Sequence, residues 1–144
     1  MNSKFLLAAL AAIVLGFLGG WLVWGIALVD FYESHSSDGA LALQKEEPVI
    51  WAAAVGSIAM GLLVTYIING FGARSAGKGF VIGVVFGFLI ALAYNMFFYS
   101  WVDMMDMTIA WVDSFINAAF SGVVGAVVGW ILGSGSKAQA APSS

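Results

Sequence analysis

The sequence predicts an all-α integral membrane protein built as a bundle of four membrane-spanning helices, and two observations support this. Hydrophobic residues make up 62% of the 144-residue chain and charged residues only 9%, whereas soluble domains average about 45–50% and about 25%. The apolar residues form four long runs, accompanied by 18 glycines and six tryptophans. Glycine is common in membrane helices, and tryptophan is enriched at their interfaces. This composition excludes a water-soluble enzyme and a nucleic-acid-binding protein.

Four apolar stretches are long enough to cross a bilayer, whose hydrocarbon core of about 30 Å needs roughly 20 helical residues. They cover residues 5–29, 49–68, 80–99 and 109–132. A cleavable signal peptide is the alternative for the first stretch. Its apolar run is longer than the roughly 7–15 residues of such a segment, and no small-residue cleavage site follows Trp21 and Trp24. We therefore expect one four-span domain over residues 1–133, followed by a flexible cytoplasmic tail over residues 134–144.

The charges between the spans predict the orientation of the chain. Four of the five basic residues lie at one end of the predicted bundle, whereas the two loops at the other end are acidic. The basic residues at the first end are Lys4, Arg74, Lys78 and Lys137. Because basic loops remain in the cytoplasm, we expect a bacterial cytoplasmic (inner) membrane protein with both termini in the cytoplasm.

Each predicted span carries small or polar residues at every fourth position, which is the spacing of one ridge on a helix. Lipid provides no hydrophobic drive for helix association, so close contact through small residues must supply it. The rows therefore predict GxxxG-type packing; a glycine-lined pore is the alternative. Close packing would leave little room for a water path inside one unit, so we expect any conduit to form between subunits. The glycines predicted to pack are Gly16, Gly20, Gly61, Gly83, Gly87, Gly125 and Gly129.

Parts of the two halves of the chain are related by a constant offset. Gly16, Gly20 and Phe31-Tyr32 recur as Gly83, Gly87 and Phe98-Tyr99. Two tandem helical hairpins would produce this pattern. The second and fourth spans do not share the offset, so four unrelated spans are the alternative.

The candidate polar cluster lies near the acidic end of the third and fourth spans and consists of Asn95, Asp106, Asp113 and Asn117. Asp113 and Asn117 share a ridge, and Asp106 precedes Asp113 by about two turns. An ionisable group at membrane depth is costly and is a functional candidate by default, which suggests a cation or proton site. The alternative is that Asp113 is a helix-end carboxylate that reaches the headgroups and offsets the helix dipole.

We predict no catalytic residue, no metal site and no cofactor. A chain without cysteine has no thiolate chemistry, and a single histidine, His35, cannot supply both axial ligands of a haem. The spans also lack the nucleophile and base pairs of membrane proteases. Thioethers favour Cu(I), but no histidine or cysteine joins the methionines near the acidic end. These methionines are Met96, Met104, Met105 and Met107.

The sequence resembles a family of small, uncharacterised bacterial four-helix membrane proteins that are grouped as a domain of unknown function. The resemblance rests on GFLGGWLVWG over residues 16–25, on Asp30-Phe31-Tyr32 and on GVVGAVVGW over residues 122–130. It would cover most of residues 5–133. It implies a four-helix membrane fold, but it implies no activity and no site residues.

The expected function is non-enzymatic. We expect a helix-packing protein that acts as an oligomer or as an accessory subunit of a membrane complex, so its partners are the lipid bilayer and either itself or other membrane proteins. The alternative is an oligomeric ion or solute transporter or channel that uses the polar cluster. A flux assay in proteoliposomes separates the two classes.

Reporter fusions test the predicted orientation. A fusion at Lys137 and one in the turn over residues 74–78 are expected to report the cytoplasm, and a tag near Asp38 is expected to report the other side. An even number of spans returns the chain to its starting side, so a periplasmic signal at Lys137 would contradict four spans.

Overall fold

The computed structural model describes residues 2–134, and this part of the chain is helical without a β-strand. Four helices are long and apolar enough to cross a membrane, with α1 and η1 forming the first together. The elements are α1 (Ser3–Leu22), the π-helix η1 (Val23–Ala27), α2 (Val29–His35), α3 (Asp38–Ala42), α4 (Ile50–Gly70), α5 (Ala76–Trp101) and α6 (Met107–Gly133). The predicted flexible tail lies outside the described residues, apart from Ser134.

The first span differs from the predicted continuous helix over residues 5–29. The α-helix changes to a π-turn at Val23, and Leu28 leaves helical geometry with φ −112° and ψ 5° before α2 begins. At Gly25, a Cβ atom would lie 2.9 Å from Cδ1 of Trp21. The missing side chain therefore leaves room for the Trp21 ring beside the π-turn.

The third and fourth spans begin a few residues earlier than predicted because polar residues cap them. The Ser75 side chain accepts a hydrogen bond from Lys78 N at 3.4 Å, and α5 begins at Ala76. The carboxylate of Asp106 accepts from Ile109 N at 3.0 Å, and α6 begins at Met107. Such caps satisfy backbone donors that the first helical turn leaves free.

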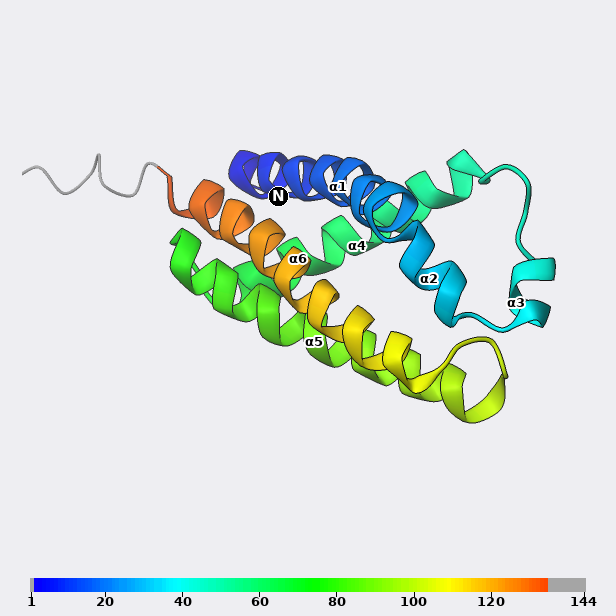
Figure 1. Ribbon diagram of the computed structural model, residues 1–144. Helices are drawn as coiled ribbons and strands as arrows, with labels where there is room; N and C mark the ends of the chain where they lie inside the picture. Colours follow the sequence, from blue (N-terminus) through cyan, green and yellow to red (C-terminus); the bar gives the residue numbers. More distant parts are fainter. Residues whose placement is uncertain (1, 135–144) are drawn as a thin grey trace, which may run out of the picture.

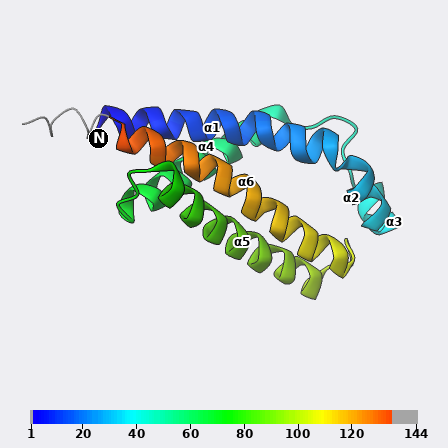
Figure 2. The same ribbon diagram turned by 60° about the vertical axis from the view of Figure 1, so that its left-hand side comes forward.

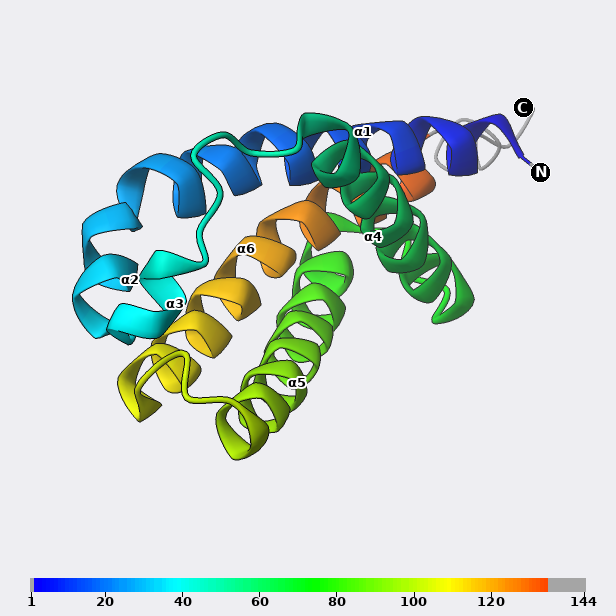
Figure 3. The same ribbon diagram turned by 90° about the vertical axis from the view of Figure 1, so that its right-hand side faces the viewer.

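The helices form two pairs in sequence order (Figure 1). α1 packs against α4, α5 packs against α6 along nearly its whole length, and α1 also contacts α6. Figure 2 shows α1 and α6 converging near the N-terminus, and in Figure 3 α4 and α5 lie apart. α5 and α6 are therefore closely joined, whereas α4 is held mainly by α1.

The α5–α6 contact is a contact of backbones. The row predicted on the third span, Gly79, Gly83 and Gly87, is buried against α6. A Cβ atom at Gly87 would lie 2.5 Å from the carbonyl oxygen of Asn117, which is too close for any real side chain. α6 contributes Gly125 and Gly129 as predicted, and also a second buried row that the sequence analysis did not single out: Ala110, Ser114, Ala118 and Gly122.

Of the glycines predicted to pack on the first two spans, only Gly61 lies in a tight contact. A Cβ atom on Gly61 would lie 2.8 Å from the backbone nitrogen of Ile13, so α4 and α1 meet there. At Gly16 and Gly20 a Cβ atom would meet nothing within 4 Å. The packing prediction is thus wrong within this chain for these two glycines, which line a cavity instead.

The apolar core lies toward the end of the bundle that carries Lys4, Arg74 and Lys78, which we call the basic end. The opposite, acidic end is fastened by backbone hydrogen bonds between two loops. Ser37 N donates to Met104 O, and Asp106 N donates to His35 O, both at 3.1 Å. The core residues are Ala8, Ala12, Val64, Ile68, Ala73, Val124, Val128 and Leu132.

The tight glycine contacts between α5 and α6 predict that larger side chains at these positions destabilise the fold. Gly87→Leu or Gly125→Leu is expected to separate α5 from α6 and to lower the thermal stability in mild detergent. Individual interhelical contacts are worth about 0.6–2 kcal/mol, and each leucine would remove several. Val85→Leu is the control, since Val85 is 53% exposed. Equal stability of all three variants would show that this contact does not hold the pair together.

Candidate functional site

Asp113 accepts hydrogen bonds from four side chains. Its Oδ1 atom accepts from Nε1 of Trp24 at 2.9 Å and from the hydroxyl of Tyr32. Its Oδ2 atom accepts from Nδ2 of Asn95 at 2.7 Å and from Nδ2 of Asn117 at 3.0 Å. These donors come from η1, α2, α5 and α6. One carboxylate therefore connects both helix pairs near the acidic end.

The four donors occupy all the hydrogen-bond acceptor positions of the Asp113 carboxylate. An ionised carboxylate offers about four lone-pair positions on its two oxygens, and Asp113 has a donor for each. Asp113 is half-buried, and removal of a charge from water is tolerated when hydrogen bonds replace the lost water. A cation would need oxygen lone pairs that these donors already occupy. The geometry therefore suits a structural link.

Tyr32 lies on α2, beyond the first candidate membrane span, and its hydroxyl donates to Asp113. Burial raises the pKa of Tyr32 well above its usual value, and the hydrogen bond to Asp113 raises it further. Burial removes the water that would stabilise a phenolate, the hydrogen bond holds the proton on the hydroxyl, and a second negative charge beside a carboxylate is unfavourable. Tyr32 therefore stays protonated and remains a donor throughout the neutral pH range.

The structure brings together three of the four residues of the predicted cluster. Asn95, only 5% exposed, joins Asp113 and Asn117. Asp106 is separate, since its carboxylate caps α6. The expectation that the Asp113 carboxylate reaches the headgroups is wrong, because it turns toward the neighbouring helices.

Trp24 and Tyr32 are members of the site that the sequence did not predict. Tryptophans near span ends suggest interface anchoring, and that interpretation hid the role of Trp24 as a donor. The π-turn at residues 23–27 and the bend at Leu28 direct these two side chains to one oxygen atom. Single-turn π-bulges often occur at functional sites, but no residue pattern in the sequence indicated this one.

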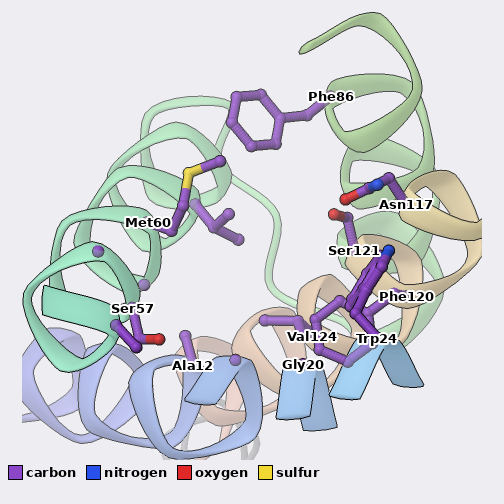
Figure 4. Close-up of a pocket in the computed structure, with 15 residues that line it drawn as sticks. Ala12, Gly20, Trp24, Ser57, Met60, Phe86, Asn117, Phe120, Ser121 and Val124 are labelled. Atoms are coloured by element: carbon purple, nitrogen blue, oxygen red, sulfur yellow. The ribbon is translucent and has the colours of Figure 1, made fainter. Parts of the chain in front are cut away.

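A cavity of about 330 Å³, which we call the lateral cleft, lies among α1, α4 and α6 beside this network. Figure 4 shows Gly20 and Ala12 of α1 at its floor, Ser57 and Met60 of α4 on one wall, and Asn117 and Ser121 of α6 on the other. Phe86 is the one lining residue from α5. The helices thus leave an apolar cavity inside one four-helix unit, whereas the expectation of little room for a water path there stays a prediction.

The lateral cleft is apolar with a few polar atoms. Thr65 and Ser114, which are buried at helix contacts, donate to carbonyls of their own helices at 2.8 and 2.6 Å. Ser57 and Ser121 instead line the cleft from opposite walls. Small and polar side chains thus face an open space between helices that are long and apolar enough to cross a membrane.

The structure assembles no metal centre within residues 2–134, where no three His, Cys, Asp or Glu side chains gather at ligand distance. The ring nitrogen Nδ1 of His35 lies 2.9 Å from both the Ser34 hydroxyl and the Phe31 carbonyl oxygen, so it has local partners.

Comparison of the chain with protein-family models, with curated proteins and with solved structures found no match. These comparisons therefore assign no family to the chain, and they add no support to the resemblance noted from its glycine-rich segments.

The Asp113 network predicts that an Asp→Asn substitution lowers the stability more at position 113 than at position 106. In Asp113→Asn, an amide NH₂ replaces one carboxylate oxygen and faces two donors. We expect a loss of about 1–3 kcal/mol in the free energy of unfolding, the usual cost of unsatisfied buried groups. Asp106→Asn is the control, because Asn caps a helix about as well as Asp. Unfolding in detergent measures both, and equal stabilities would argue against the network as a structural link.

Proposed function

We propose that the protein is a non-enzymatic, helix-packing membrane protein that works by lateral assembly, as an oligomer or as an accessory subunit of a membrane complex. The contact surface in this proposal is the lateral cleft. One observation carries the proposal: small and polar residues line an open side of the bundle. In membrane proteins such residues are enriched where helices meet.

The cleft surface has the properties of an unfilled helix contact. Gly16, Gly20 and Gly56 would each accept a Cβ atom without meeting any atom within 4 Å. Ala53 beside Gly56 is exposed as well. Glycine and alanine at these positions allow another backbone or side chain to approach closely, and Ser57 and Ser121 provide hydroxyls for interhelical hydrogen bonds.

The Asp113 network supports assembly over transport. A proton or cation site needs an ionisable group that is free to exchange its partner, and the carboxylate of Asp113 already accepts from four donors. The same network fastens α2 and η1 to α5 and α6. It therefore holds one end of the cleft in a defined shape, which favours a docking surface.

We also propose a bacterial cytoplasmic membrane as the location, with both termini in the cytoplasm. Lys4, Arg74 and Lys78 lie at one end of the helices, and Asp103 and Asp106 lie at the other. This separation of charge along the bundle supports the orientation that the positive-inside rule predicts.

The proposal is tested by filling the cleft. Gly16→Leu and Gly20→Leu introduce bulk where the chain has open space, so the fold is expected to persist while assembly weakens at least about tenfold. Loss of two or more contacts of about 0.6–2 kcal/mol would have this effect. Cross-linking in membranes and copurification from native membranes measure the assembly.

Gly77→Leu is the matched control. It is the same chemical change at an open position near the start of α5, away from the cleft. We expect wild-type assembly for this variant. A wild-type protein that is monomeric and brings down no membrane partner, or cleft variants that assemble normally, would contradict the proposal.

A further inference from the structure

A second cavity, of about 380 Å³, lies at the basic end of the bundle. It is bounded by the first turn of α1, the last turns of α4 and α6, and the turn that follows α4. Figure 2 shows the start of α1 beside the end of α6 at this place. Its polar lining includes Lys4, Arg74, Asn69 and Tyr66, and its apolar lining includes Phe5 and Leu132.

The turn between α4 and α5 places Arg74 at this cavity. Gly72 has φ +65°, a left-handed conformation that glycine adopts without strain, and it ends α4. The guanidinium of Arg74 then donates to Oδ1 of Asn69 at 3.1 Å and to the carbonyl of Ala73 at 3.0 Å. These bonds fold the side chain back beside the end of α4.

Lys4 approaches the same cavity from the other side. Its ammonium group donates to the carbonyl oxygen of Ser134, just beyond the end of α6. A lysine has three donors and an arginine five, so both cations keep donors for a further partner.

The positive charge at this cavity has no acidic side chain to balance it. All eight acidic residues of the sequence lie between Asp30 and Asp113, in the loops and helix ends of the acidic end. The N-terminus of α1 contributes a partial positive charge and the C-termini of α4 and α6 contribute partial negative charges, so Lys4 and Arg74 provide the two full charges at the cavity. An anion in the cavity would relieve this repulsion, and a phosphate suits the planar fork of arginine.

We propose that this cavity binds the phosphate headgroup of an anionic phospholipid. The proposal rests on insertion of the four helices in a bilayer and is independent of the assembly proposed above. Phe5 and Leu132 provide an apolar wall for the start of an acyl chain, and Tyr66 has the amphipathic character of residues at the membrane surface. Basic pockets between transmembrane helices bind anionic headgroups in this way. The apolar wall favours a lipid over a soluble phosphate.

Lipid binding to the purified full chain tests the proposal. Dissociation constants are measured by native mass spectrometry for phosphatidylglycerol, for zwitterionic phosphatidylcholine and for inorganic phosphate. We expect phosphatidylglycerol to bind at least about tenfold more tightly than the other two. Lys4→Gln and Arg74→Gln are each expected to weaken its binding roughly fivefold, the effect of one basic residue near a membrane surface.

Lys78→Gln is the matched control, since it removes a cation from the same end but outside the cavity. It is expected to change the affinity less than twofold. Equal binding of the two lipids, an equal effect of Lys78→Gln, or binding of inorganic phosphate as tight as that of the lipid would overturn the proposal. Thermal unfolding in phosphatidylcholine nanodiscs checks that the variants remain folded. Arg74→Lys keeps the charge but loses the planar fork, so its affinity is expected to lie between those of the wild type and Arg74→Gln.

Discussion

The close backbone contact between α5 and α6 is the constraint on which the rest of the structure depends. Gly79, Gly83 and Gly87 allow it because no Cβ atom would fit at these positions. The same row of α5 continues to Asn95, which the contact brings within 2.7 Å of Asp113. Because α5 is committed to α6 along its length, little of it remains for α4. The lateral cleft is thus a consequence of this tight pairing.

The Asp113 network links η1 and α2 to the α5–α6 pair, whereas the glycine contact involves α5 and α6 alone. α5 and α6 supply the carboxylate and the two asparagine donors, whereas Trp24 comes from η1 at the end of the first span and Tyr32 from α2 beyond it. These last two reach Asp113 only because the first span changes to a π-turn and then bends. No residue of the π-turn is fully buried. The hydrogen bonds of Trp24 and Tyr32 to the half-buried carboxylate of Asp113 tie this irregular segment to α6.

Much of the fold follows from the sequence because length and hydropathy determine which segments can cross a bilayer. The row on α5 was also predictable, since four small residues and Asn95 at every fourth position can hardly face lipid. Spacing does not specify which neighbour covers a row. Gly16 and Gly20 have the same spacing as Gly83 and Gly87, yet only the second pair meets another helix. Within the Asp113 network, Asn95 and Asn117 were predictable from their spacing. Trp24 was not predictable, because the π-turn that places it beside Asp113 depends on tertiary contacts.

The position of the lateral cleft along α4 determines from where it can be reached. Its lining on this helix runs from Ala53 to Val64, whereas Thr65 and Ile68 beyond them are fully buried. Residues 71–75 then connect α4 to α5 by a short turn, so the two helices cannot separate at that end. The α4–α5 turn therefore closes the cleft toward the basic end, and the space between α4 and α6 widens only toward the acidic end. A molecule that enters the cleft is expected to pass between these helices from the acidic end.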